Sequence, residues 1–449
     1  MIPTHCADST NGSGPAGEGR RPEQSISPKV LAAIPSEAMK HMQPKAARGS
    51  WPMRDYPLVA WLLAGLGVAI AHRWIDDADW LLLHIVLLGA LTQAIVVWSW
   101  HFAQTLLHTS EAPGGRRDQT WRLALLNAGA ILVLIGVPTH VWWVILVGAT
   151  MVAVAAGWHG WALWRMLRRA LPGRFRVSVH YYLGSAASLV LGAGLGTWLA
   201  SLDDGPLHAR VLVAHALTNT LGWVGLTLTG TLLTLWPTML RTRMDERADR
   251  WTRRAFPIFA AALLVAVSGA LLGRSWLAAG GVGVYLIGLA FWARGLWGPV
   301  RRRRPAEFAP ASVAAGLAWL TIAVAWVGWI LASTSDWTRI DDTFVWPAAT
   351  LAIGLLQVLL GASSYLLPSV LGGGPSVVRA GQAWLNLWWL ARVAVLNVCV
   401  LLWLLPTPSP VKSAAAILGV FAAALFVPLM IVGVRASLRA RSALDAAHP

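Results

Sequence analysis

Five histidines lie within long apolar stretches of the sequence, where other ionisable side chains are scarce. They are His84, His101, His159, His180 and His215. An imidazole nitrogen can bind a metal ion or carry a proton, and burying it among apolar residues is costly unless a partner compensates for the lost water. Asp and Glu, the usual proton relays of pumps and coupled transporters, do not occur in the interior of these stretches. Any metal chemistry must therefore rest on histidine.

The depth of each histidine along its predicted helix divides the five into two layers. His84 and His215 lie one to two turns from the ends of their helices that we expect to face outward. His101 follows His84 by a distance of roughly 25 Å along the helix axis, at about 1.5 Å per residue, so it belongs near the opposite surface. His159 and His180 lie at that same inner level. The sequence therefore predicts an outer pair and an inner triplet.

The outer pair suits a b-type haem, whose iron takes two axial histidines while its macrocycle is otherwise apolar. Asn219 and Gly222 follow His215 on the same helical face, so Asn219 is a candidate partner of that imidazole and the glycine leaves room for a planar cofactor. His101, His159 and His180 form a possible second metal site, where copper is one option. The alternative for each histidine is a hydrogen bond to a neighbouring helix.

Arg392 is a further candidate, in the segment "WLNLWWLARVAVLN". We expect it about eight residues inside its span, where no carboxylate of the protein is available at the same depth. A haem propionate would be a suitable partner for this guanidinium. The alternative is a side chain that extends to the lipid phosphates or caps backbone carbonyls.

The elements that position these residues are membrane-spanning helices. The chain has 449 residues, of which 56% are hydrophobic and 12% are charged, and its apolar runs are long enough to cross a bilayer. We predict an all-α bundle of about twelve spans. They cover residues 57–74, 79–107, 120–137, 141–166, 177–200, 207–239, 255–272, 275–297, 311–332, 343–367, 385–405 and 413–434.

The distribution of charge predicts the orientation and excludes nucleic acid as a partner. The net charge of +16 comes from basic residues in short connections between spans, such as "RMLRRALPGRFR" and "RRRR". The connections at the other end are acidic, as in "DDAD" and "SLDDG". The excess of arginine and lysine on the cytoplasmic side of membrane proteins then places both termini in the cytoplasm. We expect residues 1–55 to be a disordered tail, residues 56–437 the membrane domain in contact with lipid, and residues 438–449 a short basic tail.

The second and sixth predicted spans, "HIVLLGALTQAIVVWSWHF" and "AHALTNTLGWVGLTLTGTLLTLWP", resemble the corresponding helices of haem-copper oxidase subunit I and its NnrS-type relatives. The resemblance implies a low-spin haem ligand at His84 and a metal ligand at His215. The segment "GASSYLLPSVLGGGPSVVRAG" also resembles the membrane module that some actinobacteria fuse to a multicopper oxidase or copper nitrite reductase. These resemblances imply a multi-pass protein of a bacterial plasma membrane.

The sequence departs from the oxidase pattern in its second half. The oxidases require further histidines in their seventh and tenth helices, whereas this chain has none between His215 and His448. The resemblance therefore implies the fold without the oxygen-reducing centre, since fold alone does not determine function.

Two classes of function remain open on these observations. The first is a haem-binding electron-transfer subunit that passes electrons from quinol to an extracytoplasmic copper oxidase or nitrite reductase. The second is a permease or a metal- or haem-handling protein. The lack of a convincing repeat between the two halves of the chain argues against this class. An assembly or response factor for nitric oxide or copper is a weaker third option.

Overall fold

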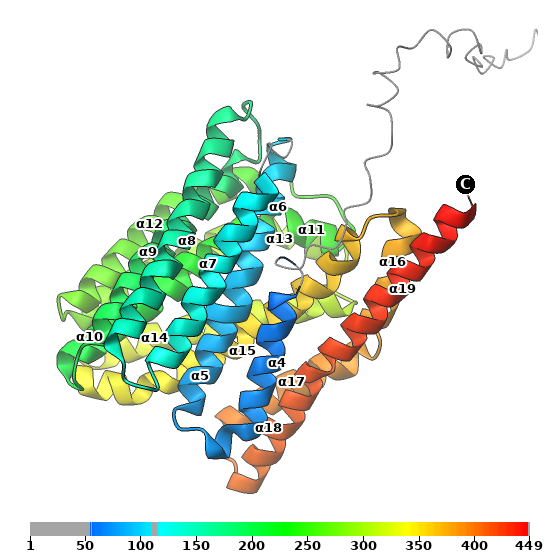
Figure 1. Cartoon of the computed structure of the whole chain (residues 1–449). Helices are drawn as coiled ribbons and strands as arrows, with labels where there is room; N and C mark the ends of the chain where they lie inside the picture. Colours follow the sequence, from blue (N-terminus) through cyan, green and yellow to red (C-terminus); the bar gives the residue numbers. More distant parts are fainter. Residues whose placement is uncertain (1–53, 55, 110–114, 448–449) are drawn as a thin grey trace, which may run out of the picture. The chain divides into compact units, whose positions relative to one another are not determined.

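The computed structural model describes residue 54 and residues 56–109 and 115–447, and within these residues every regular element is helical. The predicted tail 1–55 lies outside the described residues, apart from residue 54. The helices are α4 (Pro57–Ala71), η1 (His72–Trp74), α5 (Ala78–His84), η2 (Ile85–Leu91), α6 (Thr92–Leu106), α7 (Gly115–Gly136), α8 (Trp142–Arg169), α9 (Arg176–Leu199), α10 (Pro206–Leu217), η3 (Thr218–Gly225), α11 (Leu226–Met239), α12 (Ala248–Leu271), α13 (Ser275–Arg302), α14 (Phe308–Ser333), α15 (Trp337–Val370), α16 (Gly374–Leu385), α17 (Trp389–Leu404), α18 (Ser409–Ala424) and α19 (Phe426–Ala447) (Figure 1).

The lengths and apolar compositions of these helices confirm an all-α polytopic membrane protein. Among the described residues, 11 helices are long and apolar enough to span a bilayer, or up to 12 if the bent pair α16 and α17 forms one span. The prediction of about twelve spans agrees with this range. Several helices begin earlier or end later than predicted because charged residues extend them beyond their apolar centres. Helix α12, for example, starts at Ala248 rather than 255, and α19 runs to Ala447, so the predicted tail continues a helix as far as this residue.

Three spans form the centre of the bundle. Their apolar windows are 56%, 61% and 61% buried, against 11% to 39% for the other single-helix spans. They are Ala78–Leu106, Pro206–Met239 and Trp337–Val370. Helix α15 contacts both η2 and α10, and α6 contacts α11, so the three pack against one another. The predicted outer histidines, His84 and His215, belong to two of these central spans.

The eleventh span differs from its prediction. Residues 385–405 were predicted as one helix, but the chain turns between α16 and α17, whose axes differ in direction by 45°. The turn contains Trp388, which adopts a left-handed backbone conformation with φ of 51°. Helix α16 was not predicted because the glycine-rich segment before it, at 372–374, is typical of a loop. It packs along α19.

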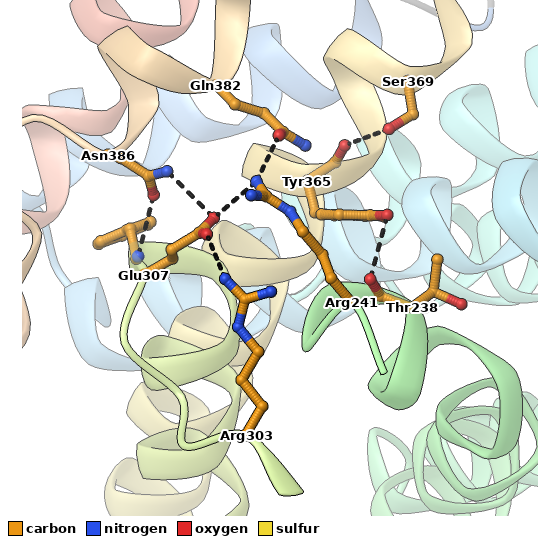
Figure 2. A network of polar contacts seen from close by, with 9 residues as sticks. Thr238, Arg241, Arg303, Glu307, Tyr365, Ser369, Gln382 and Asn386 are labelled. Carbon is orange, nitrogen blue, oxygen red and sulfur yellow. Dashed lines mark hydrogen bonds and ion pairs between the residues drawn. The ribbon is translucent and has the colours of Figure 1, made fainter. Parts of the chain in front are cut away.

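A network of polar side chains connects α16 to the rest of the bundle (Figure 2). The Arg241 guanidinium donates to Glu307 Oε2 at 3.1 Å and to Gln382 Oε1 at 3.2 Å. Asn386 Nδ2 donates to the same carboxylate oxygen, and Asn386 Oδ1 accepts from the backbone N–H of Phe308. Because Arg241 follows α11, Glu307 precedes α14 and Gln382 lies on α16, this network connects three helices at the end of the bundle that carries the basic connections. We call this the basic end and the opposite one the acidic end.

An asparagine on α7 joins three helices near the beginning of the chain. Asn127 Oδ1 accepts from Trp61 Nε1 of α4 at 2.7 Å, and Asn127 Nδ2 donates to Gln93 Oε1 of α6 at 2.9 Å. Hydrogen bonds between membrane helices contribute about 0.6 kcal/mol on average, so this chain of contacts supports the packing without dominating it.

The same arrangement recurs near the end of the chain. Asn397 Oδ1 of α17 accepts from Trp319 Nε1 at 2.6 Å, and Asn397 Nδ2 donates to Gln357 Oε1 of α15 at 3.3 Å. The surrounding sequences are also alike, "WRLALLN" at 121–127 and "ARVAVLN" at 391–397. The repeat was missed from sequence because it relates the first and last groups of spans rather than the two halves.

Candidate functional site

His84 and His215 line one cavity of about 490 Å³ near the acidic end. Its lining residues come from α5, η2, α6, α7, α8, α9, α10 and η3 and from the connections between them. The deeper lining is largely aliphatic and includes Leu87, Leu88, Val152, Leu189 and Val224. The structure therefore brings together the two histidines that the sequence placed at a common depth.

The His84 side chain is held by its own helix. Its Nδ1 lies 2.9 Å from the carbonyl oxygen of Trp80, and its ring stacks on the Trp80 indole with centroids 4.0 Å apart. A carbonyl oxygen only accepts hydrogen bonds, so the proton of a neutral imidazole belongs on Nδ1. Nε2 then keeps its lone pair, and no hydrogen bond to it is found within the described chain.

His215 is anchored by a neighbouring helix. Its Nδ1 lies 3.0 Å from the carbonyl oxygen of Gly192 on α9, which again places the proton on Nδ1 and leaves the Nε2 lone pair. Asn219 Nδ2 donates to the His215 backbone carbonyl at 2.9 Å and lies 3.3 Å from Nδ1. Because both of these nitrogens carry protons, the second contact is packing rather than a hydrogen bond. Asn219 therefore packs against the ring and bonds the backbone of its own helix, and its role as a partner of the imidazole stays a prediction.

Two glycines of α9 provide the space for these side chains. A Cβ atom on Gly196 would lie 2.8 Å from His215 Cε1, and one on Gly192 would overlap the Asn219 side chain. The signal in the sequence is the spacing of four in "GAGLG", since small residues one turn apart mark a close helix contact. Neither glycine is among the predicted site residues, and Trp80 is not among them either.

A π-helix follows each of the two histidines. Helix η2 begins directly after His84 and η3 begins three residues after His215. Wide turns of this kind are rare and occur often at functional sites. The two are connected through side chains that line the cavity, because Trp223 Nε1 of η3 donates to Thr92 Oγ1 at 3.1 Å and Thr92 Oγ1 donates to the Leu87 carbonyl of η2 at 2.8 Å. This link fixes the two histidine-bearing spans relative to each other.

The mouth of the cavity is polar. Asp77, His140, Trp142 and His208 line it together with the aliphatic residues. The sequence alone predicts both His140 and His208 as loop residues. His140 does precede α8 in a loop, but His208 lies in the first turn of α10, because Pro206 starts the helix two residues earlier. Both belong to the cavity.

The inner histidines do not assemble in the same way. His159 is buried, and its Nε2 lies 2.9 Å from Ser99 Oγ. His180 is exposed on α9 and bonds the Arg176 carbonyl, while His101 meets the edge of the Trp98 ring on α6. Among the described residues no group of three or more His, Cys, Asp or Glu side chains is placed to hold a metal ion. Copper binding by this triplet stays a prediction.

Arg392 does not line the cavity. It lies in the first turn of α17 rather than eight residues inside a span, because the chain turns before Trp389. Its guanidinium stacks over the Phe308 ring at 3.8 Å and donates to the Leu385 carbonyl at 3.0 Å. These neighbours place it at the basic end, away from His84 and His215. Its predicted role toward a cofactor at that pair is therefore not supported by its position.

Arg122 occupies the corresponding place in the repeated sequence, five residues before Asn127. It is buried, and its guanidinium lies over the Trp100 ring at 4.4 Å. Two arginines in equivalent positions, each stacked on an aromatic ring, indicate a shared packing role at the basic end.

Comparison with known proteins found no family model that matches the chain and no curated protein that matches it. The resemblance to haem-copper oxidase subunit I, to NnrS-type proteins and to copper-enzyme membrane modules accordingly stays a prediction. The class that the structure shows is an all-α polytopic membrane protein with a histidine-lined cavity near one surface.

Proposed function

We propose that the chain is a haem-binding membrane electron-transfer subunit, with one b-type haem ligated by His84 and His215. The observation that supports it is the pair of imidazoles on one cavity, each with Nδ1 fixed to a backbone carbonyl and Nε2 left as a free lone pair. Haem iron takes neutral imidazole nitrogens, and a hydrogen bond from the other ring nitrogen orients such ligands.

The surroundings of the two histidines fit this group in three respects. The aliphatic wall suits an apolar macrocycle, and the cavity volume of about 490 Å³ lies within the range of small-molecule sites. The Trp223–Thr92 link keeps the two ligand-bearing spans in register. When bound, the haem would supply one-electron transfer, while the chain supplies the ligands, their orientation and the exclusion of water.

We propose quinol as the donor and an extracytoplasmic copper oxidase or nitrite reductase as the acceptor, on the resemblance described above. The position of the cavity near the acidic end is compatible with an acceptor docking there, provided that this end faces outward.

A permease or a metal- or haem-handling protein is the second candidate. The repeated contacts of Asn127 and Asn397 favour it, because parallel internal repeats occur in several transporter folds. The two candidate functions predict different absorption spectra for the purified protein. A permease that releases its cargo should be purified without a stoichiometric chromophore.

The test is the reduced-minus-oxidised optical spectrum of the full chain, purified after expression with adequate haem. We expect a Soret band and the α band of a low-spin b-type haem at close to one haem per chain. A colourless preparation that is folded by circular dichroism would contradict the electron-transfer function and leave the permease.

The orientation follows from the charges of the connections, and we propose that the basic end faces the cytoplasm. In a variant without Cys6 and Cys399, an Asp204→Cys side chain should react with an impermeant maleimide added to intact cells. An Arg303→Cys side chain should react only after the cells are permeabilised. The reverse pattern would contradict this orientation.

A further inference from the structure

The two ends of the cavity differ in polarity, and this difference indicates which kind of ligand the cavity can bind. Most side chains of the deeper part are aliphatic, whereas Asp77, His140, Trp142 and His208 lie where α5, α8 and α10 begin. A ligand that fills such a space needs an apolar body and a polar edge. The polar groups at the mouth should then indicate what that edge carries.

Trp142 presents an unused hydrogen-bond donor. Its indole Nε1 is shielded from solvent and has no partner in the described structure, although the residue lines the cavity. Leaving a buried N–H without an acceptor is unfavourable, so natural structures rarely retain one. Because an indole nitrogen donates and never accepts, the missing group is an acceptor.

His208 provides a second polar group on the wall that carries His215. It precedes His215 by seven residues, or two turns, so both lie on the same face of α10. Its Nδ1 lies 3.4 Å from Asp341 Oδ2 of α15. Nδ1 makes no hydrogen bond to Asp341 or to any other described group, so the neutral tautomer that carries its proton on Nε2 can donate to a ligand from that edge.

We propose that Trp142 and His208 bind the carboxylates of the haem, its propionate edge, at the mouth of the cavity. This inference rests on the proposed function, and it replaces the role that the sequence suggested for Arg392. Asp77 is the single carboxylate among the described residues that line the cavity, and its charge opposes an anion. We therefore expect Trp142 and His208 to strengthen the binding of the carboxylates and Asp77 to weaken it.

The experiment compares protohaem with its dimethyl ester, in which both carboxylates are neutral esters. Full-length protein freed of haem and held in lipid nanodiscs is titrated with each compound, and the affinity ratio is measured by absorbance. We expect the wild type to prefer protohaem by about tenfold, since a hydrogen bond to a charged carboxylate is stronger than one to a neutral ester. Trp142→Phe and His208→Gln should each lower this ratio, and Asp77→Asn should raise it.

Trp143→Phe is the matched control, because Trp143 is 70% exposed and does not line the cavity. Its ratio should equal that of the wild type. A wild-type ratio near one, or a ratio unchanged in both Trp142→Phe and His208→Gln, overturns the proposed carboxylate site. If the low-spin spectrum persists in that case, the proposed function stands; if neither compound gives such a spectrum, both proposals fail. If Trp142→Phe does not fold, the other two variants still test the proposal, because His208→Gln should lower the affinity ratio and Asp77→Asn should raise it.

Discussion

Alanine at His84 or at His215 is expected to abolish the low-spin haem spectrum of the purified protein. Each substitution removes one of the two imidazoles that line the cavity, and with it a free Nε2 lone pair. The remaining imidazole can hold the iron only on one side, so any haem still bound should be high-spin and its content should fall at least tenfold. Optical spectra and haem content per chain measure both effects. Added imidazole should partly restore the low-spin spectrum, since the alanine leaves space for it.

His180→Ala is the control for this experiment. The imidazole of His180 bonds the carbonyl four residues earlier in the same way as His84 does, but it is exposed on α9 and does not line the cavity. Its replacement should leave the spectrum unchanged. An unchanged spectrum in His84→Ala or His215→Ala would show that the haem, if present, binds elsewhere.

Adding a single methyl group to α9, at Gly192 or Gly196, is expected to weaken haem binding nearly as much as replacing one of the two histidines. In Gly196→Ala the new Cβ would lie 2.8 Å from His215 Cε1, and in Gly192→Ala it would overlap Asn219. The imidazole must then leave its position or α9 must move away from α10. We expect haem affinity to fall by tenfold or more in each variant, measured by titration of the haem-free protein.

Gly194 offers a control between the two positions. A Cβ at Gly194 meets nothing within 4 Å, so Gly194→Ala should retain full affinity and could raise helix stability by up to about 1 kcal/mol. If Gly196→Ala and Gly194→Ala bind haem equally well, the close packing of α9 against His215 does not control the site.

The fold was largely predictable because a bilayer imposes long apolar helices, which hydropathy detects directly. What hydropathy could not detect are features that depend on the path of the backbone. The turn at Trp388 separates α16 from α17 and moves Arg392 to the basic end, and α16 itself begins in a glycine-rich segment. Depth along a span was therefore a sound guide for His84 and His215, in continuous spans, and misleading for Arg392.

The candidate site was predictable only in part for a related reason. The depth of the histidines suggested the pair, but the groups that orient them are backbone carbonyls, at Trp80 and Gly192, which have no signature of residue type. The residues at the mouth have no signature either, because His140 and His208 lie in or beside the connections between spans. Which of these line a common cavity depends on how α5, α8 and α10 pack, and a single sequence does not report that packing.

The central claim is that His84 and His215 ligate the same iron. The most direct measurement is the near-infrared magnetic circular dichroism of the oxidised, haem-loaded protein, which identifies the pair of axial ligands. We predict the charge-transfer band of bis-imidazole coordination in the wild type and its loss in both His84→Ala and His215→Ala. A band from any other ligand pair, or a bis-imidazole band that survives in either variant, would contradict the claim.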